Sequence, residues 1–187
     1  PLINFVTDYP VHELVETGSA LFVRGVSDRD WIYFYCPDQT EFPALIAHLK
    51  PTDKTFALVE DWMLPALSRN KSVKWQMSSM KLVMPLATAL PKPAQKVKTL
   101  GVEHAEYIYA HWSYAEVTTI EYTRERLTRG LSAGIFDGES LVAWAVTHDD
   151  GALGFLTVLP AYQGRGYALD ITLDLIARQR IKGIPSF

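Results

Sequence analysis

The segment of this 187-residue sequence best suited to chemistry is residues 158–168, VLPAYQGRGYA. Gly164 and Gly166 remove side chains and permit positive φ, while Ala168 keeps the following turn small. Free N–H groups at the first turn of a helix, with the positive end of the helix dipole behind them, form an anion site. Arg165 adds positive charge. The segment therefore predicts a loop that holds a pyrophosphate.

A long helix is predicted directly after this loop, from Gly166 to Lys182. Its apolar residues form too wide a stripe for a surface helix, so we expect it to pack on a sheet. Arg178 and Arg180 in its last turns complement the helix dipole, and Gly183 suits the C-cap.

Three strands are expected just before the loop, joined by turns that contain Asp137-Gly138 and Asp149-Asp150-Gly151: residues 131–136, 141–147 and 152–159. Together they predict an antiparallel meander. A strand at 97–100 and helices at about 102–114 and 120–129 would precede it. The order in the second half is therefore strand, two helices, three strands and a helix.

This order, together with the loop, resembles the GCN5-related N-acetyltransferase (GNAT) superfamily. The superfamily signature is Arg or Gln, two residues, Gly, one residue, then Gly or Ala, and Gln163, Gly166 and Ala168 fit it. The nearest likeness is to glycine N-acyltransferase-like and FR47-type proteins, in GALGFLTVLPAYQGRGYA and onward to RIKGIPSF. The resemblance implies an α/β (α+β) fold: a GNAT-like mixed sheet with an antiparallel meander and helices on both faces, in two GNAT-like halves.

The resemblance also implies an N-acyltransferase that moves an acyl group from acetyl-CoA or another acyl-CoA to a small amine, such as glycine or another amino acid, by direct attack. The residues implied to bind the acyl-CoA are Thr157, Val158, Gln163, Gly164, Arg165, Gly166, Tyr167 and Ala168. The preceding strand would end in a bulge, and a backbone N–H near Val158 would polarise the thioester carbonyl. The alternative is a non-catalytic acyl-CoA-binding or protein-interaction module with a degenerate site.

The general base is left open by the sequence. In the glycine acyltransferases an acidic residue just after the turn glycine is taken to be the base, whereas Ala152 stands there in this chain. His148 and Asp150 are the catalytic candidates, with Asp149 also close by. Each has a structural alternative: His148 as a strand-end residue, and both aspartates as parts of a hairpin turn. Aromatic residues at 102–129 would line the binding site of the acceptor amine or, more commonly, fill the core.

The first half alternates β-like and α-like segments and contains no phosphate loop. Strands are predicted at 2–6, 31–36, 55–59 and 73–84, and helices at 11–23, 42–49 and 62–68. Prolines 85, 91 and 93 indicate a boundary. We therefore expect an acetyltransferase-like domain at 1–94 and a GNAT acyl-CoA-binding domain at 95–187, the latter incomplete at its C-terminal end.

Composition narrows the function classes. A net charge of −3 gives no global reason to expect nucleic acid, and no apolar run approaches the ~18 residues of a membrane helix. The single cysteine, Cys36, forms neither an internal disulfide nor a metal cluster, so no metal is expected and a reducing compartment is favoured. A secretory signal is not recognisable. A cytoplasmic location is expected, with a mitochondrial one compatible with the resemblance, and the oligomeric state is not indicated.

Overall fold

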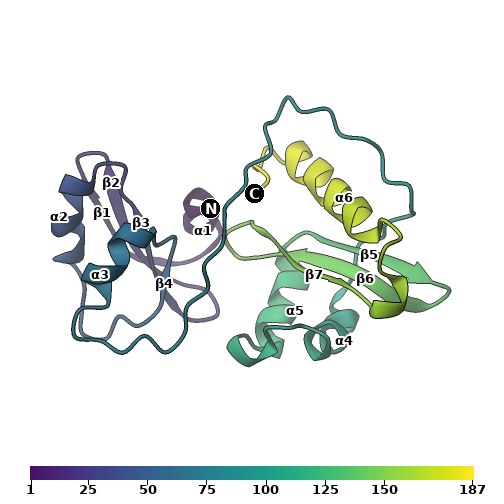
Figure 1. Cartoon of the computed structure of the whole chain (residues 1–187), viewed down its shortest axis with the longest axis horizontal. Coiled ribbons are helices and arrows are strands. Elements are labelled where there is room, and N and C mark those ends of the chain that lie inside the picture. Colours follow the sequence, from purple (N-terminus) through teal and green to yellow (C-terminus); the bar gives the residue numbers. More distant parts are fainter. The chain divides into compact units, whose positions relative to one another are not determined.

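A computed structural model describes all of residues 1–187 and divides the chain into two compact units (Figure 1). The C-terminal unit comprises Pro1, Ile3–Phe5 and Lys81–Phe187, and the N-terminal unit comprises Leu2 and Val6–Met80. The assignment of 1–94 and 95–187 as separate domains stays a prediction. None of the helices is both long and apolar enough to cross a lipid bilayer.

The N-terminal unit contains a four-stranded sheet in the order β1-β2-β3-β4. The strands are β1 (Val11–Thr17), β2 (Ala20–Val26), β3 (Asp30–Tyr35) and β4 (Phe56–Ala57). The first three are antiparallel neighbours, and β4 pairs with β3 in parallel. Helices α2 (Phe42–Ile46) and α3 (Leu64–Leu67) supply Leu45 and Leu67 to a core that also contains Phe22 and Phe34.

Three sequence predictions for the first half are wrong. Residues 2–6 lie in helix α1 (Leu2–Asp8), and residues 11–23 form a hairpin of β1 and β2. In β1 the valines and threonine have high strand propensity, which outweighs the near-helical apolar spacing. Residues 73–84 form no strand, apart from a single bridge between Met84 and Ser186, because strand propensity alone does not supply a partner. Cys36 is buried.

The sheet of the C-terminal unit is the predicted antiparallel meander. It consists of β5 (Ser132–Asp137), β6 (Ser140–Thr147) and β7 (Leu153–Val158), in the order β5-β6-β7. The central strand β6 is buried on both faces, so its sequence is nearly continuous in apolar residues rather than alternating. The predicted strand at 97–100 is wrong, since only Lys98 bridges to Gly134 on β5.

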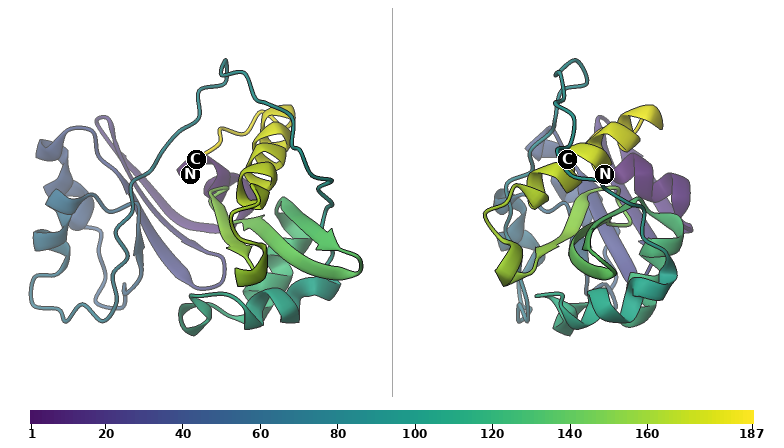
Figure 2. Two further views of the ribbon diagram at one scale, coloured as in Figure 1. Left: turned by 45° about the vertical axis from the view of Figure 1, so that its right-hand side comes forward. Right: turned by 90° about the vertical axis from the view of Figure 1, so that its right-hand side faces the viewer.

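Helices cover both faces of this sheet (Figure 2). On one face, α4 (Ala105–Ala110) and α5 (Ile120–Arg129) enclose a core with Trp144 and Phe155. On the other, α6 (Tyr167–Ile181) packs Ile171 and Leu175 against the sheet. The predicted helix at 102–114 is shorter than expected, because residues 102–104 form a 3-10 turn and α4 ends at Ala110.

Residues 84–99, which we call the strap, are tied to α6 by side chains of that helix. Near the start of α6, the buried carboxylate of Asp170 accepts hydrogen bonds from the backbone N–H groups of Ala94 (2.9 Å) and Gln95 (3.1 Å). Near the end of α6, Arg180 donates hydrogen bonds to the carbonyl oxygens of Thr88 and Pro85. The strap therefore contributes to holding the first turn of α6 in place.

Candidate functional site

Strand β7 is bulged in the middle. Trp144 faces Thr157 and Val146 faces Gly154, so Phe155 and Leu156 together oppose the single residue between those two on β6. Phe155 has a φ of 52°, in the left-handed region that costs an ordinary residue about 1–2 kcal/mol. Its ring is buried, whereas the Leu156 side chain is exposed. The bulge thus gives the second half of β7 its own geometry at the sheet edge.

Beyond the bulge, backbone groups of β7 face an open edge. The N–H of Leu159 donates to the carbonyl of Val142 on β6 at 3.0 Å. Because successive N–H groups of a strand turn to opposite sides, the N–H of Val158 points away from β6. The carbonyl of Val158 also points outward, where it accepts a hydrogen bond from Gln163 Nε2 at 3.1 Å. Val158 therefore presents a donor to the edge.

The chain then makes one 3-10 turn at Pro160–Tyr162 and reaches the glycine loop. Gly164 and Gly166 have φ values of 75° and 81°, so both adopt the left-handed conformation that favours glycine. A Cβ atom added to either would meet no atom within 4 Å. The backbone conformation, and not crowding, is therefore what calls for glycine, and the space beside the loop is open.

The N–H groups of the loop are largely unused by the protein. The N–H of Gln163 makes a long hydrogen bond of 3.4 Å to the carbonyl of Pro160, and the N–H of Asp170 bonds to the carbonyl of Gly166 at 3.1 Å. Between them, the five N–H groups of residues 164–168 donate to no protein acceptor. They lie at the positive end of the 15-residue helix α6, where an anion is favoured.

The loop lines a hollow of about 340 Å³. Its lining residues are Leu156, Val158, Tyr162, Gln163, Gly164, Gly166, Tyr167 and Ala168. Six of the eight residues that the sequence implied for acyl-CoA binding are in this set. Thr157 and Arg165 are not. Leu156 and Tyr162 were missed by the sequence reasoning, and the signal that would have found Leu156 is the bulge, which moves this residue to the edge.

Tyr162 and Arg165 form a small cluster beside the hollow. The Tyr162 hydroxyl donates to Asp137 Oδ2 at 2.8 Å, and this hydrogen bond, with burial and the carboxylate charge, raises the pKa of Tyr162. The Arg165 guanidinium lies 5.0 Å from the centroid of the Tyr162 ring and donates to the carbonyl of Ala161 at 3.0 Å. Arg165 thus places positive charge near the loop without lining the hollow.

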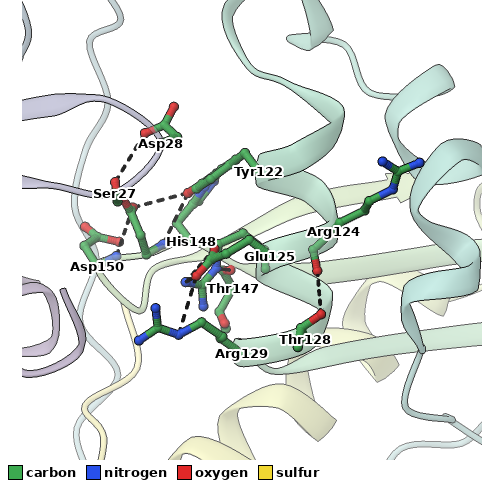
Figure 3. Close-up of polar contacts among 12 residues, drawn as sticks. Ser27, Asp28, Tyr122, Arg124, Glu125, Thr128, Arg129, Thr147, His148 and Asp150 are labelled. Carbon is green, nitrogen blue, oxygen red and sulfur yellow. Dashed lines mark hydrogen bonds and ion pairs between the residues drawn. The ribbon is translucent and has the colours of Figure 1, made fainter.

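The two catalytic candidates from the sequence lie in the turn between β6 and β7. The N–H of Gly151 bonds to the carbonyl of His148 at 3.0 Å, and Asp150 Oδ1 accepts from the N–H of Ala152 at 2.9 Å. Tyr122 on α5 points toward His148, with 3.3 Å between its hydroxyl and Nδ1 (Figure 3). Both candidates are at the start of β7, whereas the hollow is at its end. Their catalytic role stays a prediction.

Aromatic side chains from α4 and the turn after it cover the sheet near the bulge. Trp112 stacks on Phe155 with 4.6 Å between ring centroids, so it fills the core. Tyr107 and His111 instead contact Trp144 and keep part of their rings exposed. No group of three or more His, Cys, Asp or Glu side chains is arranged to hold a metal ion.

Comparisons with solved structures bear on the fold. The crystal structure of a Drosophila protein aligns with a TM-score of 0.68 at 16% identity, covering 89% of this chain and 64% of that one. This chain therefore spans less than two thirds of that protein, and the likeness shows a shared fold. No curated protein matches.

Two bacterial structures align more weakly. One is a protein of unknown function from Enterococcus faecalis called a probable N-acyltransferase, with a TM-score of 0.40, 19% identity and coverage of 48% of this chain and 27% of that one. The other is a GCN5-related N-acetyltransferase-like protein from Streptococcus suis, with a TM-score of 0.41, 10% identity and coverage of 100% and 82%. Scores this low add no argument.

A family model described as FR47-like protein matches residues 130–187. The matched stretch contains the whole meander, the bulge, the glycine loop and helix α6. The mixed α/β architecture with helices on both faces of the meander agrees with the fold that the sequence predicted. Residues 130–187 are therefore similar to FR47-like proteins.

Proposed function

We propose that this chain is an N-acyltransferase that moves an acyl group from acetyl-CoA or another acyl-CoA to a small amine. The group transferred is an acyl group other than aminoacyl. Glycine or another amino acid is the favoured acceptor class. The observation that carries the proposal is the set of five N–H groups at residues 164–168 that have no protein acceptor, in a loop that lines one hollow at the start of α6.

The hollow suits a pyrophosphate by charge and by donors. Backbone N–H groups and the positive end of a helix dipole stabilise a bound anion even without a positively charged side chain. Arg165 adds a cation close to the loop. The one acid in the first turn, Asp170, is turned away to the strap, where two N–H groups hold its carboxylate. Repulsion of a phosphate by this residue is thereby reduced.

The open edge of β7 suits the arm that carries the thioester. An amide-containing chain would pair with the outward-facing groups after the bulge, as a short extra strand. The N–H of Val158 would then donate to the thioester oxygen as negative charge develops on it. Attack by the amine nitrogen and departure of the thiolate require no covalent intermediate on the protein, so positioning and polarisation supply much of the rate.

The second candidate function is a non-catalytic acyl-CoA-binding or protein-interaction module. Ala152, which stands where the glycine acyltransferases have an acidic residue, favours it. Thiol release from acetyl-CoA in the presence of glycine and a panel of other small amines separates the two functions. Turnover supports the enzyme, and ligand binding without turnover supports the module.

Binding itself is tested with Gly166→Glu, using Gly138→Glu as a matched control. Both glycines have positive φ, 81° and 59°, and both have open space beside them, but Gly138 lies in the β5–β6 turn. Both variants should lose about 1–2 kcal/mol of stability from the backbone conformation alone. Acetyl-CoA should raise the Tm of wild type and Gly138→Glu by mass action, and not that of Gly166→Glu. An unchanged shift in Gly166→Glu would show that the loop is not the site.

A further inference from the structure

We infer that His111, the residue at the C-cap of α4, is the general base that accepts the proton of the attacking amine. The inference rests on the proposed acyltransferase function and deepens it, since the acidic residue expected in the strand is replaced by Ala152. It is carried by three features of His111: a fixed tautomer, a position near the bulge, and an exposed ring.

The tautomer follows from one contact. His111 Nδ1 lies 2.8 Å from the carbonyl oxygen of Tyr107, one turn earlier on α4. A carbonyl oxygen only accepts hydrogen bonds, so in the neutral ring Nδ1 carries the hydrogen and Nε2 carries the lone pair. Since the backbone N–H of His111 is directed to Ile108, the imidazole also caps a carbonyl that the end of the helix leaves open. The contact with the backbone thus leaves Nε2 as the basic nitrogen of the ring.

Ring contacts place His111 over the middle of the central strand β6, next to the bulged part of β7. The centroids of the His111 and Tyr107 rings are 4.3 Å apart, and the Trp144 ring meets His111 edge-on at 5.9 Å. Trp144 is the cross-strand partner of Thr157, the residue before Val158. On the next residue after His111, the indole of Trp112 stacks on the bulge residue Phe155. His111 therefore packs on the β6 residue that pairs with β7 beside the bulge, and its chain neighbour Trp112 packs on the bulge itself.

The same cluster contains a polar group that the protein leaves unsatisfied. Trp144 is fully buried, and its Nε1 has no acceptor. A buried donor without a partner costs about 1–3 kcal/mol, so natural proteins retain few of them. This cost falls on the residue that supports the His111 ring, which is what is expected where packing serves a site rather than stability alone.

Few ionisable groups surround the imidazole. The Tyr107 phenol is the titratable side chain stacked on it, and β6 offers the neutral indole of Trp144. Where α5 packs against α4, Arg124 and Glu106 pair with each other. By contrast, His148 is held in the turn at the opposite end of β7.

The chemical step is balanced as follows. The amine nitrogen forms a bond to the thioester carbonyl carbon, and the proton that it loses passes to Nε2 of His111. The bond between carbon and sulfur then breaks, and the thiolate leaves with the electron pair. The imidazolium returns its proton to the thiolate or to water, which restores the neutral ring.

The test compares His111→Ala and His111→Gln with wild type in thiol release from acetyl-CoA, using glycine as acceptor. The glutamine variant keeps a side-chain donor for the Tyr107 carbonyl but has no basic nitrogen. Both should lose roughly 10²-fold in kcat/KM and should lose the rise in rate with pH that a general base gives. The KM for acetyl-CoA and the thermal shift should stay at wild-type values, and added imidazole should restore part of the rate to His111→Ala.

Two further arms make the result specific. His104→Ala, at the other end of the same helical segment, should keep wild-type kinetics, and His148→Ala should keep the wild-type pH profile. An unchanged pH profile in His111→Ala, or loss of the profile in His148→Ala instead, overturns the assignment and leaves the acyltransferase proposal standing. Wild type that binds acetyl-CoA but acylates no amine overturns both.

Discussion

The side chain of Gln163 reaches back five residues and donates a hydrogen bond from Nε2 to the carbonyl oxygen of Val158, at 3.1 Å. This bond joins the first residue of the glycine loop to the last residue of the bulged strand. It uses the side-chain donor of Gln163, so the glutamine braces the loop and leaves phosphate contacts to the backbone. The bond also holds the outward-facing carbonyl of Val158 in place. It thereby helps to fix the orientation of Val158, whose own N–H faces the open edge of β7.

Replacing Gln163 by Ala should therefore weaken acyl-CoA binding without removing it. A hydrogen bond of this kind contributes about 0.5–1.5 kcal/mol, so the Kd for acetyl-CoA measured by calorimetry should rise about 2- to 12-fold. Gln76→Ala is the control, because the exposed Gln76 side chain bonds only to Ser78. A Kd for Gln163→Ala equal to that of wild type would mean that the brace plays no part in forming the site.

The second prediction concerns the strap. Asp170 is buried and receives two backbone N–H groups, whereas Asp174, one turn later on α6, makes a partly exposed ion pair with Arg178. Asp170→Asn replaces an acceptor by an amide donor that faces an N–H group, so it should cost about 1–3 kcal/mol in urea unfolding. Asp174→Asn should cost only about 0.2–1 kcal/mol. Equal losses in the two variants would contradict a specific role for the strap contact.

The sequence predicted the C-terminal unit better than the N-terminal unit, and the reason is physical. Around β5, β6 and β7, turn residues such as Asp137-Gly138 and a clear helix end at Gly183 agree with the apolar pattern. In the hairpin of β1 and β2 the apolar spacing suited a helix, and strand propensity together with pairing between the strands selects the observed structure. Residues 73–84 show the opposite outcome. Their strand propensity is high, but they form no strand because no neighbouring strand pairs with them.

Within the candidate site, the loop was predictable and its surroundings were not. Glycine at positive φ and free N–H groups at a helix start are local properties, so Gly164 and Gly166 were identified from their spacing alone. The exposed position of Leu156 depends on a bulge, which is set by register against β6. The contact between His111 and Trp144 joins residues 33 positions apart, and such contacts are decided by packing rather than by local pattern.

The final prediction concerns acid stability of the N-terminal unit. There the buried guanidinium of Arg24 makes two hydrogen bonds to Asp53, at 2.7 and 3.2 Å, and also pairs with Glu13. Burial alone would raise the pKa of Asp53, but the hydrogen bonds from Arg24 and from the Lys50 backbone, with the nearby positive charges, outweigh it and lower the pKa. The carboxylate of Asp53 is thus more acidic in the folded chain than in the unfolded chain.

The sign of the pH effect follows from this difference. An unfolded aspartate has a pKa of about 3.9, so as pH falls the unfolded chain takes up the proton first. The stabilisation from Asp53 is present above that value and is lost as pH falls through the lower folded-state pKa. Asp53→Asn should lose about 1.5–3 kcal/mol at neutral pH, because a hydrogen-bonded charge is removed, and the loss should shrink toward zero in acid. Urea unfolding of wild type and variant between about pH 7 and about pH 2 measures this convergence, with Glu139→Gln as an exposed acid control. Parallel curves, with a constant gap at every pH, would show that Asp53 acts through shape and not through its charge.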